Sequence, residues 1–296
     1  MQQANRTDIL FFGLKRSTVQ LLRFPFSFFL MPVFWFAAGQ VVHKDWRSIM
    51  LIFIILHGLV YPSSNGYNSY MDRDETSIGG LKNPAQPTLQ LLQLTFAMDL
   101  LAILLGFMIS IYFAAGITAY ILASRAYSYR GIRLKKYPLA GYLTVVFFQG
   151  AVIFFLVYHG SSTDKTLHVP SSAMLASSLL VGGFYPLTQV YQQEADIKDG
   201  VKTISWLLGY RGTFVFALLL YSLAFLTLAY YFFSSLESKE FFVLATCMLP
   251  VLVYFCNWAA KVWKDTRQAN FENTMKMNIL ASCCTNIGFI VVLLIQ

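Results

Sequence analysis

Nine stretches of this chain are each apolar enough and long enough to cross a lipid bilayer as a helix, which takes roughly 20 residues. They lie near residues 24–42, 48–70, 88–108, 110–126, 138–158, 171–192, 211–233, 240–262 and 277–295. Only 12% of the residues are charged, about half the share found in an ordinary soluble domain. The sequence therefore predicts an all-α, polytopic membrane protein: a bundle of nine transmembrane helices, with residues 1–296 forming a single membrane-embedded domain.

The basic residues predict the orientation of the chain. When the N-terminus is placed in the cytoplasm, 18 of the 22 lysines and arginines fall in cytoplasmic segments. The other four are Lys44, Arg47, Lys165 and Lys239. Because cytoplasmic loops carry such an excess, the net charge of +8 reflects topology, and no nucleic-acid partner is expected. We expect a multi-pass protein of a bacterial inner membrane or its equivalent, with residues 1–23 as an interfacial segment.

Polar side chains gather where the second stretch ends. Asn65, Asn68 and Asp72 are spaced i, i+3 and i+7, so they share one face of a helix. Glu75 extends this face if the helix continues. Amide and carboxylate oxygens are the ligands that Mg²⁺ uses when a substrate phosphate completes its shell. The segment therefore predicts half of a magnesium site.

A second acidic segment ends the sixth stretch. Gln189, Gln192, Asp196 and Asp199 are spaced i, i+3, i+7 and i+10, again on one helical face. Four predicted spans separate Asp72 from Asp196, and an even number returns the chain to the same side of the membrane. We therefore expect the two acidic faces to meet at one cytoplasmic cavity.

Basic residues accompany both acidic segments. Lys82 follows the first, while Lys198 and Lys202 belong to the second. Arg133 and Lys135 lie in the most basic loop of the chain, where they offset the charge of a phosphorylated substrate. Ordinary topological charge is the competing interpretation of each basic residue in this loop. Together with apolar walls, the set suits a polyprenyl diphosphate, whose loss of diphosphate leaves an allylic cation that aromatic rings stabilise.

These segments resemble the motifs of the UbiA superfamily of intramembrane prenyltransferases, and the resemblance covers essentially the whole chain. Asn68 and Asp72 match the first two positions of that family's N-x-x-x-D-x-x-x-D motif. Asp196 and the segment 200–203 match the end of its D-x-x-x-D motif, and residues 133–135 resemble its basic loop. The resemblance implies nine transmembrane helices, Mg²⁺ as cofactor, and a prenyl diphosphate donor.

Two positions depart from the family pattern. Thr76 replaces the third acidic residue of the first motif, and Gln192 replaces the first of the second motif. Glu75 and Asp199 lie within about one helical turn of these positions, so we expect them to compensate. The predicted metal ligands are thus Asn68, Asp72, Glu75, Asp196 and Asp199, and the predicted diphosphate contacts are Lys82, Arg133, Lys135, Lys198, Lys202 and Gln192.

Three further polar residues are candidates for catalysis or for binding the acceptor: Tyr61 and Asn65 on the second span, and Asp99 inside the third. An ionisable residue within a span is a functional candidate by default. A buried, hydrogen-bonded structural role is the alternative for Asp99.

We expect Mg²⁺-dependent transfer of a prenyl group to an acceptor, most plausibly aromatic, in quinone or related lipid synthesis. One alternative keeps the fold but quenches the cation internally, as terpene cyclases of the superfamily do. Another is a prenyl-lipid binding or transport protein, although the polar groups gather at helix ends and not at the bilayer midplane.

Overall fold

The computed structural model describes residues 13–295, and the regular elements in this range are helices. The chain divides into two compact units. Unit 1 contains residues 13–28 and 53–133, and unit 2 contains residues 29–52 and 134–295. The chain crosses between the units at three points, so each unit is built from separate stretches of sequence.

Unit 1 carries the first acidic segment. Its helices are α1 (Arg16–Leu22), the π-helical η4 (Ile54–Val60), α4 (Tyr61–Asp72), α5 (Leu89–Phe107) and α6 (Ile111–Ser128), with the start of the 3₁₀ helix η3 (Phe24–Leu30). The helices α4, α5 and α6 pack against one another, and α1 packs on α4 and α5.

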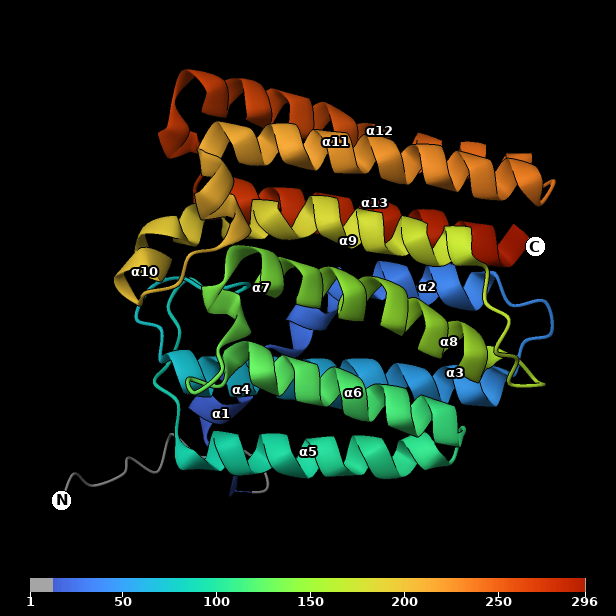
Figure 1. Cartoon of the computed structure of the whole chain (residues 1–296), viewed down its shortest axis with the longest axis horizontal. Helices are drawn as coiled ribbons and strands as arrows, with labels where there is room; N and C mark the ends of the chain where they lie inside the picture. Colours follow the sequence, from blue (N-terminus) through green and yellow to red (C-terminus); the bar gives the residue numbers. More distant parts are fainter. Residues whose placement is uncertain (1–12, 296) are drawn as a thin grey trace. The chain divides into compact units, whose positions relative to one another are not determined.

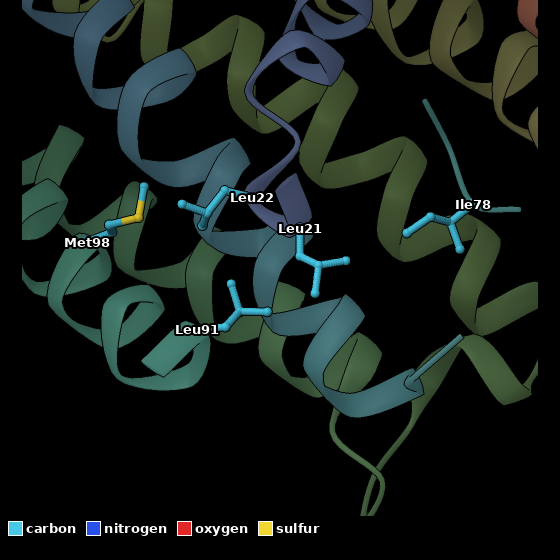
Figure 2. Close-up of a cluster of buried hydrophobic side chains, with 5 residues drawn as sticks. All are labelled: Leu21, Leu22, Ile78, Leu91 and Met98. Carbon is cyan, nitrogen blue, oxygen red and sulfur yellow. The ribbon is translucent and has the colours of Figure 1, made fainter. Parts of the chain in front are cut away.

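Leucines of α1 hold the core of unit 1 together. Leu21 and Leu22 are buried with Leu91, Met98 and Ile78, the last from the loop after α4 (Figure 2). Full burial of a Leu, Ile or Met side chain stabilises a fold by about 1.5–3 kcal/mol in water, and within a bilayer close packing takes over part of this role.

The middle of α4 lies close to its neighbours because residue 66 is a glycine. A Cβ at Gly66 would lie 2.9 Å from Thr95 Cγ2, and 3.0 Å from the side chains of Leu22 and Leu91. Small residues at helix interfaces allow such approaches. Gly66 therefore fixes the position of the helix that carries Asn68 and Asp72.

Unit 2 carries the second acidic segment. Its helices are α2 (Met31–Gly39), α3 (Trp46–Phe53, whose last residue belongs to unit 1), η5 (Leu134–Lys136), α7 (Pro138–Val145), the π-helical η6 (Val146–Val152), α8 (Ile153–Ser161), α9 (Ser171–Gln189), η7 (Val190–Gln192), α10 (Gln193–Lys198), α11 (Ile204–Ser234), α12 (Ser238–Lys264), η8 (Thr266–Gln268) and α13 (Phe271–Ile295). In Figure 1, α9 runs beside α11, and these two helices pack along each other.

An aromatic cluster forms part of the core of unit 2. The ring of Phe36 stacks on Phe289 at a centroid distance of 4.6 Å, and it meets Phe154 edge-on at 5.2 Å. Tyr231 approaches the same ring, and its hydroxyl donates to Gln40 Oε1 at 2.8 Å. Aromatic pairs add about 0.5–1.5 kcal/mol beyond the area that they bury. The cluster thus joins α2, α8, α11 and α13.

A proline interrupts the hydrogen-bond ladder of α9 shortly before the second acidic segment. Pro186 has no N–H, so the carbonyl of Gly182 loses its partner within the helix. The Tyr142 hydroxyl from α7 donates to this carbonyl at 3.1 Å. The break in the ladder is therefore satisfied by a neighbouring helix, as it must be in a bilayer.

The expected spans are found as helices. Eight helical stretches within residues 13–295 are long and apolar enough to cross a membrane. The remaining expected span, 110–126, forms α6, which has the length but is not among those eight. Of the expected interfacial segment, residues 1–12 lie outside the described range, and the rest includes α1.

Candidate active site

The first acidic segment ends α4 abruptly. Arg73 adopts a left-handed conformation (φ 54°, ψ 44°), and its N–H donates to the Ser69 carbonyl at 3.1 Å. Such a residue closes many helices, although it is usually glycine. Asn65, Asn68 and Asp72 all lie within α4, so their expected helical spacing is confirmed.

The expected position of Glu75 is wrong. Because α4 ends at Asp72, neither Asp74 nor Glu75 continues its face. Glu75 is exposed, so the helical spacing that predicts it on the face of Asp72 does not apply. The role of Glu75 as a metal ligand stays a prediction.

The end of α6 and the turn after it contact α4 at several places. The Ser128 hydroxyl, which is 1% exposed, accepts a hydrogen bond from Asn68 Nδ2 at 3.0 Å. The guanidinium of Arg130 donates to the main-chain oxygens of Met71 at 2.7 Å and Asp72 at 3.3 Å. These carbonyls are among the last four of the helix, which lack partners within it. Arg130 therefore stabilises the helix end.

Arg133 lies beside the carboxylate of the motif. Its Nη2 is 3.6 Å from Asp72 Oδ1, and the two side chains are 11% and 5% exposed. Arg133 also has a left-handed backbone (φ 52°), with its N–H donating to the Tyr129 carbonyl at 2.7 Å. The structure thus brings a predicted metal ligand and a predicted diphosphate contact together within unit 1.

The two acceptor candidates on the second span are inward-facing. Tyr61 is 2% exposed, and its ring meets those of His57 at 5.1 Å and Tyr120 at 6.1 Å. Asn65 Nδ2 is buried with no hydrogen-bond partner among the described residues. The Asn65 carbonyl accepts from Arg23 at 3.4 Å. Both residues remain candidates.

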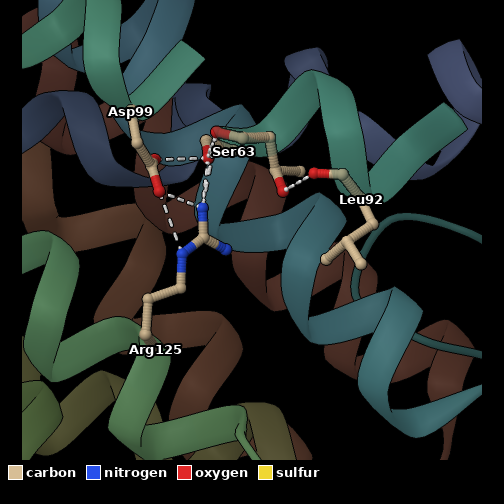
Figure 3. A network of polar contacts seen from close by, with 5 residues as sticks. Ser63, Leu92, Asp99 and Arg125 are labelled. Atoms are coloured by element: carbon tan, nitrogen blue, oxygen red, sulfur yellow. Dashed lines mark hydrogen bonds and ion pairs between the residues drawn. The ribbon is translucent and has the colours of Figure 1, made fainter. Parts of the chain in front are cut away.

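Asp99 belongs to a buried charge network on α4, α5 and α6 (Figure 3). Arg125 Nε lies 2.9 Å from Asp99 Oδ2, and Nη2 of the same guanidinium also contacts this carboxylate. The Ser63 hydroxyl donates to Asp99 Oδ1 at 2.6 Å and accepts from Arg125 at 2.8 Å. Arg125 also covers the ring of Tyr67 at 4.0 Å. Removing one partner of a buried pair costs about 3–5 kcal/mol, so the geometry favours the structural role of Asp99.

The second acidic segment is not one continuous helix, contrary to expectation. The α-helix ends at Gln189, residues 190–192 form a 3₁₀ turn, and α10 begins at Gln193. A 3₁₀ turn rotates about 120° per residue in place of 100°. The three residues of this turn therefore rotate Asp196 by about 60° relative to Gln189, compared with the continuous α-helix that their spacing assumes.

The end of α10 forms a regular C-terminal cap. Gly200 is left-handed (φ 71°), and its N–H donates to the Ile197 carbonyl at 2.9 Å. The N–H of Val201 donates to the Asp196 carbonyl at 2.8 Å. This is the bond pattern of a Schellman motif. Asp199 occupies the cap and is exposed, while the side chain of Asp196 is half-buried.

Buried polar groups tie α10 to the start of α11. Gln193 Nε2 donates to the Ser205 carbonyl at 3.0 Å and to its hydroxyl at 2.8 Å. The Thr213 hydroxyl donates to the Gly209 carbonyl at 2.7 Å, across a kink at Gly209 (φ 66°) inside α11. This network anchors the second acidic segment, while Gln192 beside it is half-buried.

The other predicted diphosphate contacts lie in connections at the helix ends. Lys82 follows the turn after α4 and is exposed, and Lys135 lies in η5 and is half-buried. Lys198 and Lys202 flank the cap of α10 and are exposed, with Lys202 Nζ 4.9 Å from the ring centroid of Trp206. Their contacts with a diphosphate stay predictions.

Comparison with known sequences decides the family. The sequence model of the UbiA prenyltransferase family matches residues 26–280. The chain belongs to the UbiA prenyltransferase family. It is accordingly a prenyltransferase, and the expected membership of this family is confirmed. No curated protein matches this chain.

Solved structures confirm the UbiA fold. A UbiA homologue from Archaeoglobus fulgidus bound to DMAPP and Mg²⁺ has a TM-score of 0.71 at 18% identity, over 95% of this chain and 100% of that chain. The same homologue bound to GPP and Mg²⁺ also scores 0.71, at 19% identity over 94% and 99% of the two chains. The apo UbiA homologue from Aeropyrum pernix K1 scores 0.67 at 18% identity, over 91% and 98%.

The residues of this UbiA chain fit Mg²⁺ only with help from a ligand. The hydrogen bond to Ser128 engages Asn68 through its N–H and leaves the amide oxygen as a hard donor. Asp72 adds a carboxylate at the same helix end. Within residues 13–295, no three His, Cys, Asp or Glu side chains lie close enough to hold a metal. Oxygens of a bound phosphate would have to complete the shell.

Sequence reasoning missed the partners of these residues. Arg125, Ser128 and Arg130 looked like ordinary residues at the end of a span, yet each contacts α4. One signal for Arg125 was present, because a carboxylate inside a span needs a partner on a neighbouring helix. Ser128 and Arg130 carried no such signal.

Proposed function

We propose that this UbiA prenyltransferase catalyses Mg²⁺-dependent transfer of a prenyl group from a polyprenyl diphosphate to an aromatic acceptor, in quinone or related lipid synthesis. The observation that carries the proposal is the end of α4, where Asn68 and Asp72 offer oxygens to a metal and Arg133 lies within 3.6 Å of Asp72. The A. fulgidus homologue is bound to DMAPP or GPP with Mg²⁺, and both ligands are prenyl diphosphates.

We assign the roles along the two acidic segments. Asn68 and Asp72 of unit 1, and Asp196 of unit 2, would hold the metal ions, with Glu75 and Asp199 as further ligands. The diphosphate would lie against Arg133, Lys135 and the lysines Lys82, Lys198 and Lys202, with Gln192 as a neutral contact. We also propose that residues 1–296 act as a single catalytic domain.

The reaction breaks the bond between C1 of the prenyl group and the diphosphate oxygen, and its electron pair leaves with the diphosphate. The metal would offset the negative charge that develops there. A ring carbon of the acceptor supplies the electron pair of the new bond to C1, and the ring then releases a proton to solvent. Basic residues at the helix ends hold the leaving group, while the apolar helices exclude water from the cation.

The orientation is also a proposal. The distribution of Lys and Arg supports a cytoplasmic N-terminus, with both acidic segments on the same side. Impermeant thiol reagents on intact cells test this, with one cysteine placed at Glu75 or at Lys239 in a cysteine-free variant. Only the Lys239→Cys variant should react from outside.

The test of the function uses protein purified into nanodiscs. Geranylgeranyl diphosphate and Mg²⁺ are supplied with and without hydroxybenzoate, naphthoate and homogentisate, and diphosphate release and lipid products are followed. Asp72→Ala and Asp196→Ala should lower the rate by at least about 100-fold. Asp265→Ala is the matched control, because it removes an exposed carboxylate paired with Arg267 in the connection between α12 and α13.

The products separate the competing functions. Prenylated acceptor formed only with Mg²⁺ and both aspartates supports the proposal and names the acceptor. A cyclised hydrocarbon formed without acceptor indicates a terpene cyclase. Binding of the donor without any release of diphosphate would contradict catalysis and favour a lipid-binding protein.

A further inference from the structure

The segment Ser128–Arg133, which we term the α6 tail, contacts each chemical part of the motif on α4. Ser128 bonds the Asn68 amide, Arg130 bonds the carbonyls at the helix end, and Arg133 lies against the Asp72 carboxylate. A cation placed on Asp72 would have to share this position with Arg133. The α6 tail therefore bears directly on metal binding.

Arg133 is held in place by its backbone. A non-glycine residue with a left-handed backbone is disfavoured by about 1–2 kcal/mol, and the surrounding structure must impose it. Here the N–H groups of Ile132 and Arg133 both donate to the Tyr129 carbonyl, at 3.0 and 2.7 Å. Arg133 is only 9% exposed. Its position beside Asp72 is thus part of the fold and not a chance surface contact.

The charge of Arg133 affects how a cation binds to Asp72. Two buried like charges are strongly disfavoured, so a divalent cation and a guanidinium compete for the same carboxylate. Unit 1 offers few other metal ligands, because no three acidic, His or Cys side chains cluster among the described residues. A diphosphate changes this balance, since its oxygens attract both the cation and the planar guanidinium.

We propose that Arg133 is a counter-ion latch: it occupies Asp72 in the ligand-free protein and moves onto the diphosphate when cation and diphosphate bind together. The inference rests on the proposed function and adds to it how the binding of the cation depends on the diphosphate. A divalent cation alone binds weakly, and diphosphate strengthens its binding. Ser128 keeps Asn68 oriented throughout, because its contact does not involve the charge that is exchanged.

The experiment measures binding and not turnover. Mn²⁺ replaces Mg²⁺, and the Mn²⁺ retained by nanodiscs of zwitterionic lipid is measured by electron paramagnetic resonance after the discs are separated from solution, with and without inorganic pyrophosphate. Protein-free nanodiscs correct for the complex that pyrophosphate forms with Mn²⁺ in solution. Arg133→Gln removes the latch. Lys136→Gln is the matched control, because Lys136 is an exposed base three residues further on and its loss changes the net charge equally. Thermal unfolding of each variant checks that it is folded.

In the wild type, pyrophosphate should raise the affinity for Mn²⁺ by at least about tenfold. In Arg133→Gln, the affinity for Mn²⁺ alone should rise by about tenfold, and the gain from pyrophosphate should largely disappear. Lys136→Gln should stay within about twofold of the wild type.

Two results would overturn the latch, and they are distinguishable. If the wild type binds Mn²⁺ with pyrophosphate but Arg133→Gln binds Mn²⁺ alone no better, or no better than Lys136→Gln does, the latch is wrong and the proposed metal site stands. If the wild type binds no Mn²⁺ even with pyrophosphate, the metal site itself is wrong, and the latch fails with it.

Discussion

At the scale of single residues, Ser128 determines which end of the Asn68 amide is available to a metal. The hydroxyl takes the amide N–H at 3.0 Å, and a buried N–H without a partner costs about 1–3 kcal/mol. Such a partner of a metal ligand commonly changes metal affinity 10–100-fold when it is lost. The side chain of Asn68 is thus oriented by a residue on another helix.

We therefore expect Ser128→Ala to raise the Mg²⁺ concentration for half-maximal activity by about tenfold, since the amide is then free to rotate. Ser128→Thr keeps the hydroxyl and should restore the wild-type value. Titration of activity with Mg²⁺ at saturating donor measures this. An equal loss in both variants, with unchanged Mg²⁺ dependence, would mean that Ser128 only fills space.

The stability of the fold should depend on pH through Asp45, which lies on the predicted outer side of the membrane. Hydrogen bonds from the hydroxyl and backbone N–H of Ser48, together with the Lys165 ammonium at 3.2 Å, hold the pKa of Asp45 at about 2, below its ordinary 3.8. A carboxyl with a lowered pKa stabilises the fold fully above its unfolded pKa, and this contribution is lost as the pH falls towards 2.

The difference in thermal midpoint between the wild type and Asp45→Asn should therefore be constant above pH 5 and vanish between about pH 4 and pH 2. Since the pair is partly exposed, the effect should not exceed about 1 kcal/mol. Unfolding followed by circular dichroism across this pH range measures it. A difference that grows on acidification would contradict the assignment.

At the scale of elements, glycines set how closely helices approach. A Cβ at Gly150 of η6 would lie 2.5 Å from Ser178 Cα, which is backbone of α9 and cannot move aside alone. At Gly58 of η4 a Cβ would meet only Ile54 Cγ2, at 3.9 Å. Two glycines in similar π-helical segments thus have different surroundings.

Gly150→Ala should destabilise unit 2 by about 1–3 kcal/mol, because overpacking forces the helices apart. Gly58→Ala should be neutral or slightly stabilising, since alanine favours the helix by up to about 1 kcal/mol. Thermal unfolding of both variants in the same detergent compares them directly. The same loss in both would show that close approach is not the cause.

The sequence predicted the spans but not how the motif helices end. Long apolar stretches identify transmembrane helices because a bilayer imposes length and composition. The end of α4 was missed because Arg73 is an ordinary helix former that takes a left-handed backbone here. Pro186 lies inside α9, six residues before Gln192, but the 3₁₀ turn that follows has no sequence pattern of its own.

Only the part of the candidate site that lies within a single helix could be predicted from the sequence. Asn68 and Asp72 share a helix, so their spacing placed them correctly. Ser128 and Arg133 lie about 60 positions further along the chain than Asn68 and Asp72, and Ser128 nevertheless accepts a hydrogen bond from Asn68. Such contacts depend on how α4 and α6 pack, and a single sequence does not encode that in any local pattern.

At the scale of the whole molecule, each compact unit contributes one acidic segment from the end of a membrane helix. Separate stretches of chain build each unit, so neither can be isolated by cutting the chain once. The proposed catalysis thus belongs to the intact bundle. Two of its helices, α5 and α6, should also depend on each other for insertion into the membrane.

The ion pair between Asp99 and Arg125 affects how the protein is made. Each residue alone opposes entry of its helix into the membrane: Asp99, near the middle of α5, by up to about 2.5–3.5 kcal/mol, and Arg125, near the end of α6, by less. In addition, α6 is not among the described helices that are long and apolar enough to cross by composition. Paired, the two charges offset each other. During synthesis, α5 and α6 should therefore leave the translocon as a hairpin.

In a glycosylation-mapped insertion assay, residues 111–128 alone should insert poorly, and residues 89–128 should insert well. Asp99→Leu should then lower insertion of the second helix of that hairpin, even though it makes the first more apolar. Efficient insertion of the lone segment would contradict the dependence. A contact that looks like a detail of packing would thus decide whether the nascent chain acquires its topology.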